Sequence, residues 1–453
     1  MDKRVCTICF HDVDVEHTRL GRELEPFLSG IIKANIPRWD VRNAVCIHCI
    51  ERFISAQAEL DSYLPKGADN LKILPTALRL GASPRFTGRG ITIAFLDSGF
   101  YWHPDLTRPE VRIVGYVNVF SSPSSFQDLM QSDVSSWHGM MTSVVAAGNG
   151  YLSRGIYRGI ASNARLVLVK VGSAQRIKHN HITRGLRWII RHRHEYNIRI
   201  VNISCGGDFE ASYLHDPLSQ AAEEAVKAGL VVIAAAGNAG HQANHAIIPP
   251  ASAPSVITVG GLDDKNSLDP ANDDMYHSSF GPTIDGLQKP ELLAPGIWVA
   301  APILPGTPTA AQAQLLDELE RTPDTQLRSV ITSNPGIDAD LDAAAALEPY
   351  LVRHLVEIKL RSNNVISSHY KHVDGTSFAA PIVSSIVAQM LEANPYLTPQ
   401  QVKQILIKTA ERIPHVAVDR QGWGVVNPRS AVAHALELKL SHTNKPSAPL
   451  VAD

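Results

Sequence analysis

The sequence predicts an α/β fold, a doubly wound and mostly parallel sheet with helices on both faces, to which a small N-terminal module and a helical insertion are added. Strand-like and helix-like segments alternate from Thr87 onward, which is typical of parallel strands joined by crossover helices. The strand-like segments are mainly apolar, as strands buried on both faces are. Polar residues follow several of them, at the strand ends where open α/β sheets place their sites.

The composition is that of a globular protein. The chain has 453 residues, of which 44% are hydrophobic and 19% charged, so it can form one large domain with attachments. A formal net charge of -2 gives no electrostatic reason to expect nucleic acid or an anionic membrane as the main partner. The first residues lack the apolar segment of a secretory signal, and the longest apolar run, 230–236, is too short to span a bilayer. We therefore expect a cytoplasmic protein.

Two Cys-x-x-Cys pairs characterise the N-terminal module, which we place at residues 1–65 and expect to be followed by a linker at 66–86. Their spacing lets four thiolates bind one tetrahedral Zn²⁺, and a module of this size needs such support for its small core. The alternatives are a redox pair, which the lack of a surrounding βαβ pattern disfavours, and two disulfides. The expected ligands are Cys6, Cys9, Cys46 and Cys49. A nearby histidine could replace one thiolate: His11, His17 or His48.

The first two elements of the main domain carry a carboxylate and an imidazole. The segment 90–96 is a buried-type strand that is followed by Asp97, although an aspartate there can also be a plain turn residue. The segment 137–148 is a helix of small and β-branched residues with His138 near its start. A histidine in that position can equally be a polar cap.

Two further strands end without bulky side chains. The strand that begins at Ile200 ends in the segment 204–207, so another backbone could lie against it. The strand that begins at Leu230 ends in Asn238. This asparagine is either a turn residue that tolerates a left-handed conformation or an amide directed at an oxyanion.

A turn containing Gly375, Thr376 and Ser377 opens an apolar helix that continues through Met390. A helix N-terminus presents free backbone N–H groups and the positive end of the helix dipole, which favour developing negative charge. Taken alone, Ser377 could be an ordinary N-cap.

The chemistry of these residues is complementary. A serine hydroxyl becomes a nucleophile when an imidazole takes its proton, a carboxylate orients the imidazole, and fixed donors stabilise the tetrahedral oxyanion. The residues that supply these parts are Asp97, His138, Asn238 and Ser377. The sequence therefore predicts a serine hydrolase.

The motifs around these residues resemble those of the subtilisin-like serine peptidases, the subtilase family, in the family's order Asp, His, Ser. The resemblance extends over about 89–303 and 372–436. The motifs are Asp97-Ser98-Gly99 with His103-Pro104-Asp105-Leu106, His138-Gly139, Ser204 to Gly207, Ala235 to Asn238, Ala294-Pro295-Gly296 and Gly375 to Pro381.

The resemblance implies a subtilisin-like domain, at 87–440, and a role for each residue. Ser377 would attack the scissile carbonyl, His138 would act as base and then acid, and Asp97 would orient His138. The Asn238 amide and the Ser377 backbone N–H would bind the oxyanion. An extended peptide substrate would pair with the chain beside the serine. The substrate-binding residues would be Ser204, Cys205, Gly206, Gly207, Ala236 and Gly237.

Three features depart from the family's pattern. Met140 stands where a threonine usually follows His-Gly, which removes a hydroxyl near the base. The segment 149–164 lacks the acidic and amide ligands of a structural Ca²⁺ site, so we predict no calcium. Residues 1–86 do not resemble the family's inhibitory prosegment, because the cysteine pairs are better explained by a metal.

A long insertion at 304–370 is not explained by the resemblance. The segments 310–320 and 341–360 are predicted to be helices, with a break near Asn334. The insertion joins the segment that leads to Ser377, so it is either a lid or docking site near the cleft or a surface decoration. Beyond the serine helix, Thr398 is predicted to cap another helix. The polar tail at 441–453 is predicted to be flexible.

Two functions are compatible with the sequence. The leading one is a serine endopeptidase acting on peptide or protein substrates. The alternative is a binding protein with a peptidase fold and little or no catalysis, which recruits a regulatory partner through the zinc module and the insertion. The presence of all the catalytic side chains favours the first, and Met140 slightly favours the second.

Overall fold

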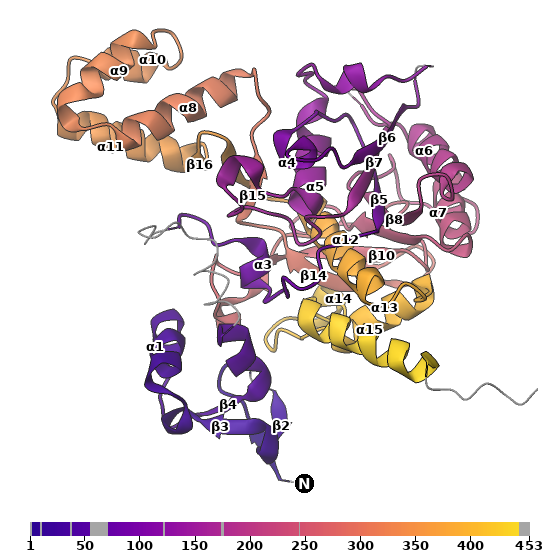
Figure 1. Ribbon diagram of the computed structural model, residues 1–453. Helices are drawn as coiled ribbons and strands as arrows, with labels where there is room; N and C mark the ends of the chain where they lie inside the picture. Colours follow the sequence, from indigo (N-terminus) through magenta and orange to yellow (C-terminus); the bar gives the residue numbers. More distant parts are fainter. Residues whose placement is uncertain are drawn as a thin grey trace, which may run out of the picture.

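An eight-stranded sheet forms the centre of the structure (Figure 1). The structure is a computed structural model that describes residues 2–9, 11–36, 39–54, 71–120, 123–173, 176–243 and 245–443. The strand order is β11-β10-β9-β8-β5-β7-β6, with β14 beside β10, and every pair is parallel except β10 with β11. The strands are β5 (Thr92–Asp97), β6 (Ile113–Asn118), β7 (Arg165–Lys170), β8 (Ile198–Ile203), β9 (Val231–Ala235), β10 (Ile257–Asp263), β11 (Asp274–Met275) and β14 (Leu292–Pro295).

Helices cover both faces of this sheet because its strands are apolar on both sides. In β5, Ile93 and Phe95 belong to one buried cluster and Ala94 and Leu96 to another, as the two-residue period of a strand requires. The first cluster includes α5 (Ser136–Ala147), α12 (Thr376–Ala393), α13 (Pro399–Thr409) and α15 (Pro428–Thr443), and the second α6 (His179–His192) and α7 (Pro217–Lys227). The predicted doubly wound α/β fold is confirmed.

Further short elements lie in the loops of the main domain, the module and the insertion. They are α4 (Pro104–Thr107), α14 (Val418–Gln421), β12 (Gly281–Pro282), β13 (Gln288–Lys289) and the 3-10 helices η1 (Val15–His17), η2 (Gly21–Glu23), η3 (Phe126–Leu129), η4 (Tyr151–Ser153), η5 (Pro270–Asn272) and η6 (Asp324–Gln326). The predicted cap at Thr398 is confirmed, since its side chain accepts the N–H of Gln401 at the start of α13.

The N-terminal module packs at one end of the molecule (Figure 1). It contains β1 (Lys3–Val5), β2 (Asp12–Asp14), β3 (Thr18–Leu20), β4 (Ala44–Cys46) and α1 (Pro26–Asn35). A helix starts at Ile47, directly after β4, and continues to Ile54. The end of the expected module and the first part of the expected linker, 55–70, lie outside the described residues.

The rest of the expected linker is folded against the main domain. It contains α3 (Thr76–Arg79), which ends in a buried arginine. The Arg79 guanidinium contacts the carboxylate of Asp264 and donates to the carbonyl oxygen of Trp298 at 2.9 Å. This segment therefore connects the module to the loops beside the sheet.

The insertion forms a separate group of helices at the upper left of the view in Figure 1, while the module lies at the lower left. Its elements are α8 (Pro308–Arg321), α9 (Leu327–Ser333), α10 (Ala339–Ala344) and α11 (Pro349–Ser362), with a small core of their own. The expectation of one helix over 341–360 is wrong. Pro349 opens a new helix, as a residue without an N–H does, and α9 was not predicted.

Three strands attach the insertion to the domain. They form the sheet β15-β17-β16, with β15 at Val299–Pro302, β16 at Val365–Ser367 and β17 at Tyr370–Val373. Strand β17 runs directly into the turn before α12, so the insertion is joined to the serine segment as expected.

No helix among the described residues is long and apolar enough to cross a membrane. Helix α15 ends at Thr443, and residues 444–453 of the predicted tail lie outside the described part of the chain.

Candidate active site and metal centre

The predicted catalytic residues come from elements that meet at one edge of the sheet. Strands β5, β8 and β9 are adjacent and parallel, so their carboxyl ends lie together. Asp97 ends β5, Ser204 follows β8, and Asn238 lies three residues after β9. Helices α5 and α12 begin near this edge and bring His138 and Ser377 to it.

Asp97 and His138 form a close pair. The Nδ1 atom of His138 lies 2.8 Å from Oδ1 and 2.9 Å from Oδ2 of Asp97. The Asp97 side chain is 1% exposed and the His138 side chain 20%, so the carboxylate is shielded while one side of the imidazole faces the solvent. The backbone N–H of Ser98 donates to Asp97 Oδ1 at 2.7 Å.

The glycine after His138 allows this approach. A Cβ atom on Gly139 would lie 2.1 Å from the carbonyl oxygen of Gly99 and 2.9 Å from the Cβ of Asp97. Any larger residue would therefore push α5 away from β5 and separate the imidazole from the carboxylate.

A hydroxyl that sequence reasoning missed also reaches the carboxylate. The buried side chain of Thr142 donates to Asp97 Oδ2 at 3.2 Å and lies 3.1 Å from the carbonyl oxygen of Gly139. Thr142 is four residues after His138, so both lie on one face of α5, and that spacing could have identified it. Thr142, two residues after Met140, thus supplies a hydroxyl to the carboxylate of the pair.

The environment of His138 changes its affinity for a proton. Burial lowers the pKa of His138, but the charge of Asp97 and the hydrogen bond to it outweigh burial, so the pKa is raised above its ordinary value. Burial raises the pKa of Cys205 well above that of a free thiol, and the nearby charge of Asp97 adds to this effect. Cys205 is therefore a protonated packing residue behind the Asp97–His138 pair.

Ser377 lies in the first turn of α12 and is held against the segment after β8. Its hydroxyl donates to the carbonyl oxygen of Ser204 at 3.2 Å, and the Ser204 hydroxyl donates to the carbonyl oxygen of Ser377 at 2.8 Å. The ring of Phe378, the next residue, lies 5.9 Å from the His138 ring. In the described part of the chain no hydrogen bond joins Ser377 directly to His138.

Asn238 is fixed beside the serine turn by a residue whose role was not predicted. Its Oδ1 accepts the backbone N–H of Thr376 at 3.0 Å and the Thr376 hydroxyl at 2.9 Å. The same hydroxyl accepts the N–H of Gly237 at 3.1 Å. The Nδ2 donor of this exposed asparagine lies beside the turn, 3.6 Å from where a Cβ atom on Gly375 would stand.

The serine turn depends on two glycines. Gly375 has a φ of 137°, a conformation that side chains rarely adopt. Its N–H donates to the carbonyl oxygen of Gly296 at 2.7 Å. The Ala294-Pro295-Gly296 motif therefore supports the turn that presents Ser377.

The expected substrate strand is glycine-rich for a packing reason. A Cβ on Gly206 would lie 2.7 Å from Cδ1 of Ile248, and one on Gly207 would lie 2.5 Å from Nδ1 of His179. The N–H of Gly207 already donates to Pro249. The N–H of Gly207 is therefore not free to pair with an added strand.

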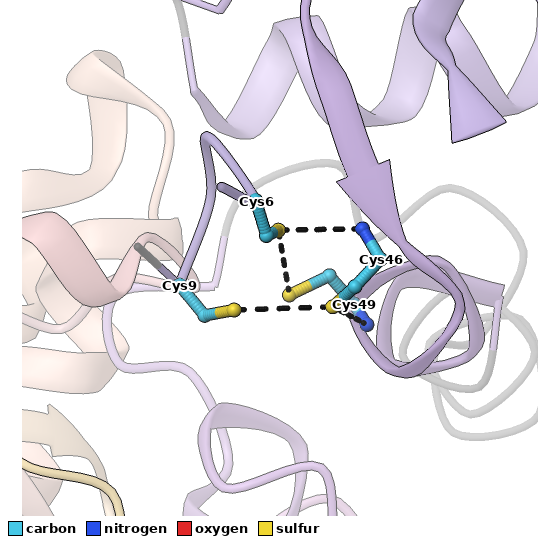
Figure 2. Close-up of side chains that lie close together, drawn as sticks. All are labelled: Cys6, Cys9, Cys46 and Cys49. Carbon is cyan, nitrogen blue, oxygen red and sulfur yellow. Dashed lines mark hydrogen bonds between the residues drawn. The ribbon is translucent and has the colours of Figure 1, made fainter. Parts of the chain in front are cut away.

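The four expected metal ligands converge within the N-terminal module, with their side chains directed toward one point (Figure 2). Their sulfur atoms all lie within 4.8 Å of one another. Two of the Sγ–Sγ distances, Cys6 to Cys49 and Cys9 to Cys46, are 3.8 Å, close to the value of about 3.8 Å implied by tetrahedral Zn–S bonds of about 2.3 Å. Each of these contacts joins a cysteine of the first Cys-x-x-Cys pair to a cysteine of the second, so the two pairs face each other.

Backbone donors also point at these sulfur atoms. The N–H of Cys46 donates to Cys6 Sγ at 3.3 Å, and the N–H of Cys49 donates to Cys46 Sγ at 3.4 Å. Hydrogen bonds from the side chains of Cys46 and then Cys49 lower the pKa of Cys6 below that of a free thiol, and hydrogen bonds with Cys46 and Cys6 raise the pKa of Cys49. Such donors stabilise thiolates, which are the form that binds a metal.

Most of the chain matches a known protein family. The sequence model of the subtilase family matches residues 88–424, which include every residue of the candidate active site. The chain belongs to the subtilase family. Within it, serine protease AprX of Bacillus subtilis (strain 168) is 32% identical over 357 residues, which are 76% of this chain and 67% of AprX.

Other matches have lower identity. Subtilisin NAT of Bacillus subtilis subsp. natto is 30% identical over 232 residues, which are 50% of this chain and 51% of subtilisin NAT. The crystal structure of fervidolysin from Fervidobacterium pennivorans, a keratinolytic enzyme related to subtilisin, has a TM-score of 0.53 and 21% identity. That match covers 79% of this chain and 45% of the fervidolysin chain, and it supports the fold alone.

Proposed function

We propose that this subtilase is a serine endopeptidase in which Ser377, His138 and Asp97 form the catalytic triad and Asn238 contributes to the oxyanion hole. The observation that carries the proposal is the buried Asp97–His138 pair at the same sheet edge as the Ser377 turn. A buried carboxylate that accepts Nδ1–H fixes the imidazole tautomer whose Nε2 can take a proton.

The proposed reaction follows from these positions. Ser377 Oγ attacks the carbonyl carbon of the scissile bond and gives its proton to His138 Nε2. The oxyanion that forms is stabilised by Asn238 Nδ2 and the Ser377 backbone N–H. The C–N bond then breaks as His138 passes the proton to the leaving amine. Water hydrolyses the acyl-enzyme, with His138 again acting first as base and then as acid.

The serine hydroxyl must change its partner for this reaction. It donates to the carbonyl oxygen of Ser204, and we propose that a bound peptide takes over that carbonyl through its own N–H. The freed hydroxyl would then turn to His138. Catalytic hydrogen bonds often form only in the substrate complex, so the present arrangement is compatible with this role.

Labelling with a fluorophosphonate probe tests the proposal. We expect the purified protein to be labelled and to hydrolyse a fluorogenic peptide, and we expect Ser377→Ala to abolish both. Ser385→Ala is a matched control, because Ser385 is a buried serine of the same helix whose hydroxyl donates to Ile382. A folded wild type that is neither labelled nor active would instead support the peptide-binding alternative, in which the peptidase fold has lost its catalysis.

We also propose that the N-terminal module binds one structural zinc ion through Cys6, Cys9, Cys46 and Cys49. The convergence of four thiols at tetrahedral spacing supports this assignment. Metal analysis of the purified protein should find about one zinc ion per chain, and Cys6→Ser with Cys46→Ser should eliminate it. A folded wild type that contains no metal and binds none would reject the proposal. Reduced thiols of this kind suit a reducing compartment, and on that basis we propose that the protein acts in the cytoplasm.

A further inference from the structure

The helix that holds one of the expected metal ligands also contacts the peptidase domain. This helix, Ile47 to Ile54, begins between Cys46 and Cys49. His48 and Arg52 lie four residues apart on it and therefore on one face. Because two ligands flank its first turn, the direction of this face depends on the geometry of the metal site.

Both side chains reach residues of the peptidase domain. His48 Nε2 lies 3.1 Å from Asn427 Nδ2 and 3.5 Å from Glu411 Oε1. Arg52 donates to the carbonyl oxygen of Arg79. These residues line a small polar cavity of about 50 Å³ between the module and the domain. Apolar contacts add to them, since Leu78 and Leu268 belong to the same buried cluster as Cys6.

The first contact leads to the serine turn through a strand. Glu411 pairs in both directions with Val425, at 2.8 and 2.7 Å, and Val425 forms a parallel bridge with Leu293 of β14. Strand β14 ends at Pro295 and is followed by Gly296, whose carbonyl oxygen accepts the N–H of Gly375.

The second contact leads to the same turn from the other side. The Arg79 guanidinium donates to the carbonyl oxygen of Trp298. The Trp298 ring lies 4.9 Å from the ring of His372 on β17, three residues before Gly375. The contacts of His48 and Arg52, which we call the two anchors of the module, are therefore linked to the two segments beside the Gly375 turn. One segment contains Gly296 and the other is β17.

We propose that the metal-loaded module holds the Gly375 turn in place through these two contacts, so that peptidase activity depends on a metal ion that lies outside the active site. The inference rests on the proposed metal site and the proposed peptidase activity. Without the metal, four converging thiols no longer fix the helix after Cys46, and a module with so small a core loosens. His48 and Arg52 then leave Glu411 and Arg79, and the turn that positions Ser377 loses two of its supports. Small losses of positioning at a catalytic group reduce the rate strongly.

The test compares metal-loaded and metal-stripped forms of the full chain. The uncoupled variant combines Arg52→Met with Glu411→Gln, which removes one anchor on each side and leaves all four cysteines. The control is Arg42→Met, because Arg42 is an exposed arginine of the module that pairs with Asp40 at 2.8 Å. Three quantities are measured for each protein: zinc per chain, Tm, and kcat/KM on a fluorogenic peptide.

We expect stripping of the wild type to lower kcat/KM about five-fold or more and to lower the Tm, and both should return when Zn²⁺ is added. Arg42→Met should behave in the same way. The double variant should still bind zinc, but its loaded form should have the kcat/KM of the stripped wild type and should not respond to stripping.

Three results would overturn this proposal: a stripped wild type with unchanged kcat/KM and Tm, a double variant that responds to zinc as the wild type does, or a wild type that binds no zinc. A wild type that fails to react with the fluorophosphonate would overturn the proposed peptidase function instead. The Tm of the two variants would then still decide whether the metal module stabilises the domain through these anchors.

Discussion

The hydrogen bond from Thr142 to Asp97 gives the sharpest test of the proposed triad. Thr142→Val replaces a buried hydroxyl by a methyl group of similar size, so it removes the donor to Asp97 Oδ2 without opening a cavity. A hydrogen bond to a charged group contributes about 1.5–3 kcal/mol. The Thr142–Asp97 distance of 3.2 Å exceeds the common O–H···O distance of about 2.7–2.8 Å, so we take the lower end.

Thr142 also fixes the orientation of Asp97, and if the transition state loses about 1.5 kcal/mol of this positioning, kcat decreases about ten-fold. We expect KM to change little, because Thr142 is buried beneath the pair and does not face the substrate. Asp97 would also attract the His138 proton more strongly once this donor is gone. The pKa of His138 should therefore rise further, and the acid limb of the pH–rate profile should move to higher pH.

Steady-state kinetics between pH 5 and pH 9, a range of about two units on either side of the ordinary histidine pKa, measures both effects. Ser143→Ala is the matched control: its hydroxyl is buried in the same helix turn but donates to Gly139 and Met140 rather than to Asp97. Thr142→Ser should retain most of the activity. The reasoning is refuted if Thr142→Val keeps the wild-type kcat and pH profile, or if Ser143→Ala changes them as much.

Four further predictions concern the same site. In the wild type, kcat/KM should fall on the acid side with an apparent pKa above about 6.5, because His138 must be neutral to act as base and its pKa is raised; an acid limb below that value would contradict the assignment. The contribution of His138 to the free energy of unfolding depends on pH in the opposite direction. It is fully present below the unfolded-state pKa and is lost as pH rises through the folded-state pKa. Calorimetry at several pH values measures this dependence. Gly139→Ala should lower the Tm and the activity together, by about 1–3 kcal/mol in stability, because the added Cβ meets the backbone of Gly99; a variant with unchanged Tm would show that α5 can move away freely. Asn238→Ala should reduce kcat about 10²–10³-fold with little change in KM, and a nearly normal kcat would exclude its Nδ2 as an oxyanion donor.

Much of the sheet and the site could be predicted from local sequence. Apolar strand segments followed by Asp97 and Asn238, and helix starts that carry His138 and Ser377, identify the fold because each pattern reports burial or backbone geometry within a few residues. The Cys-x-x-Cys pairs likewise predict that four cysteines converge in the N-terminal module, since the spacing of each pair already brings two thiols together. The insertion was harder: α9 was not predicted, and Pro349 rather than the apolar period decided where α11 begins.

The sequence by itself determined which chemical groups are present and the edge of the sheet at which they stand, because strand periodicity and turn residues are local properties. Only the tertiary structure decided their partners. Thr142 donates to Asp97, Thr376 fixes Asn238, and Ser204 holds the Ser377 hydroxyl. In the module, His48 and Arg52 contact Glu411 and Arg79. Each of these contacts joins residues through the packing of separate elements or through side-chain direction. The spacing of Thr142 from His138 is a local signal, but the other contacts follow from how helices and loops close on one another, and no short stretch of sequence contains that information.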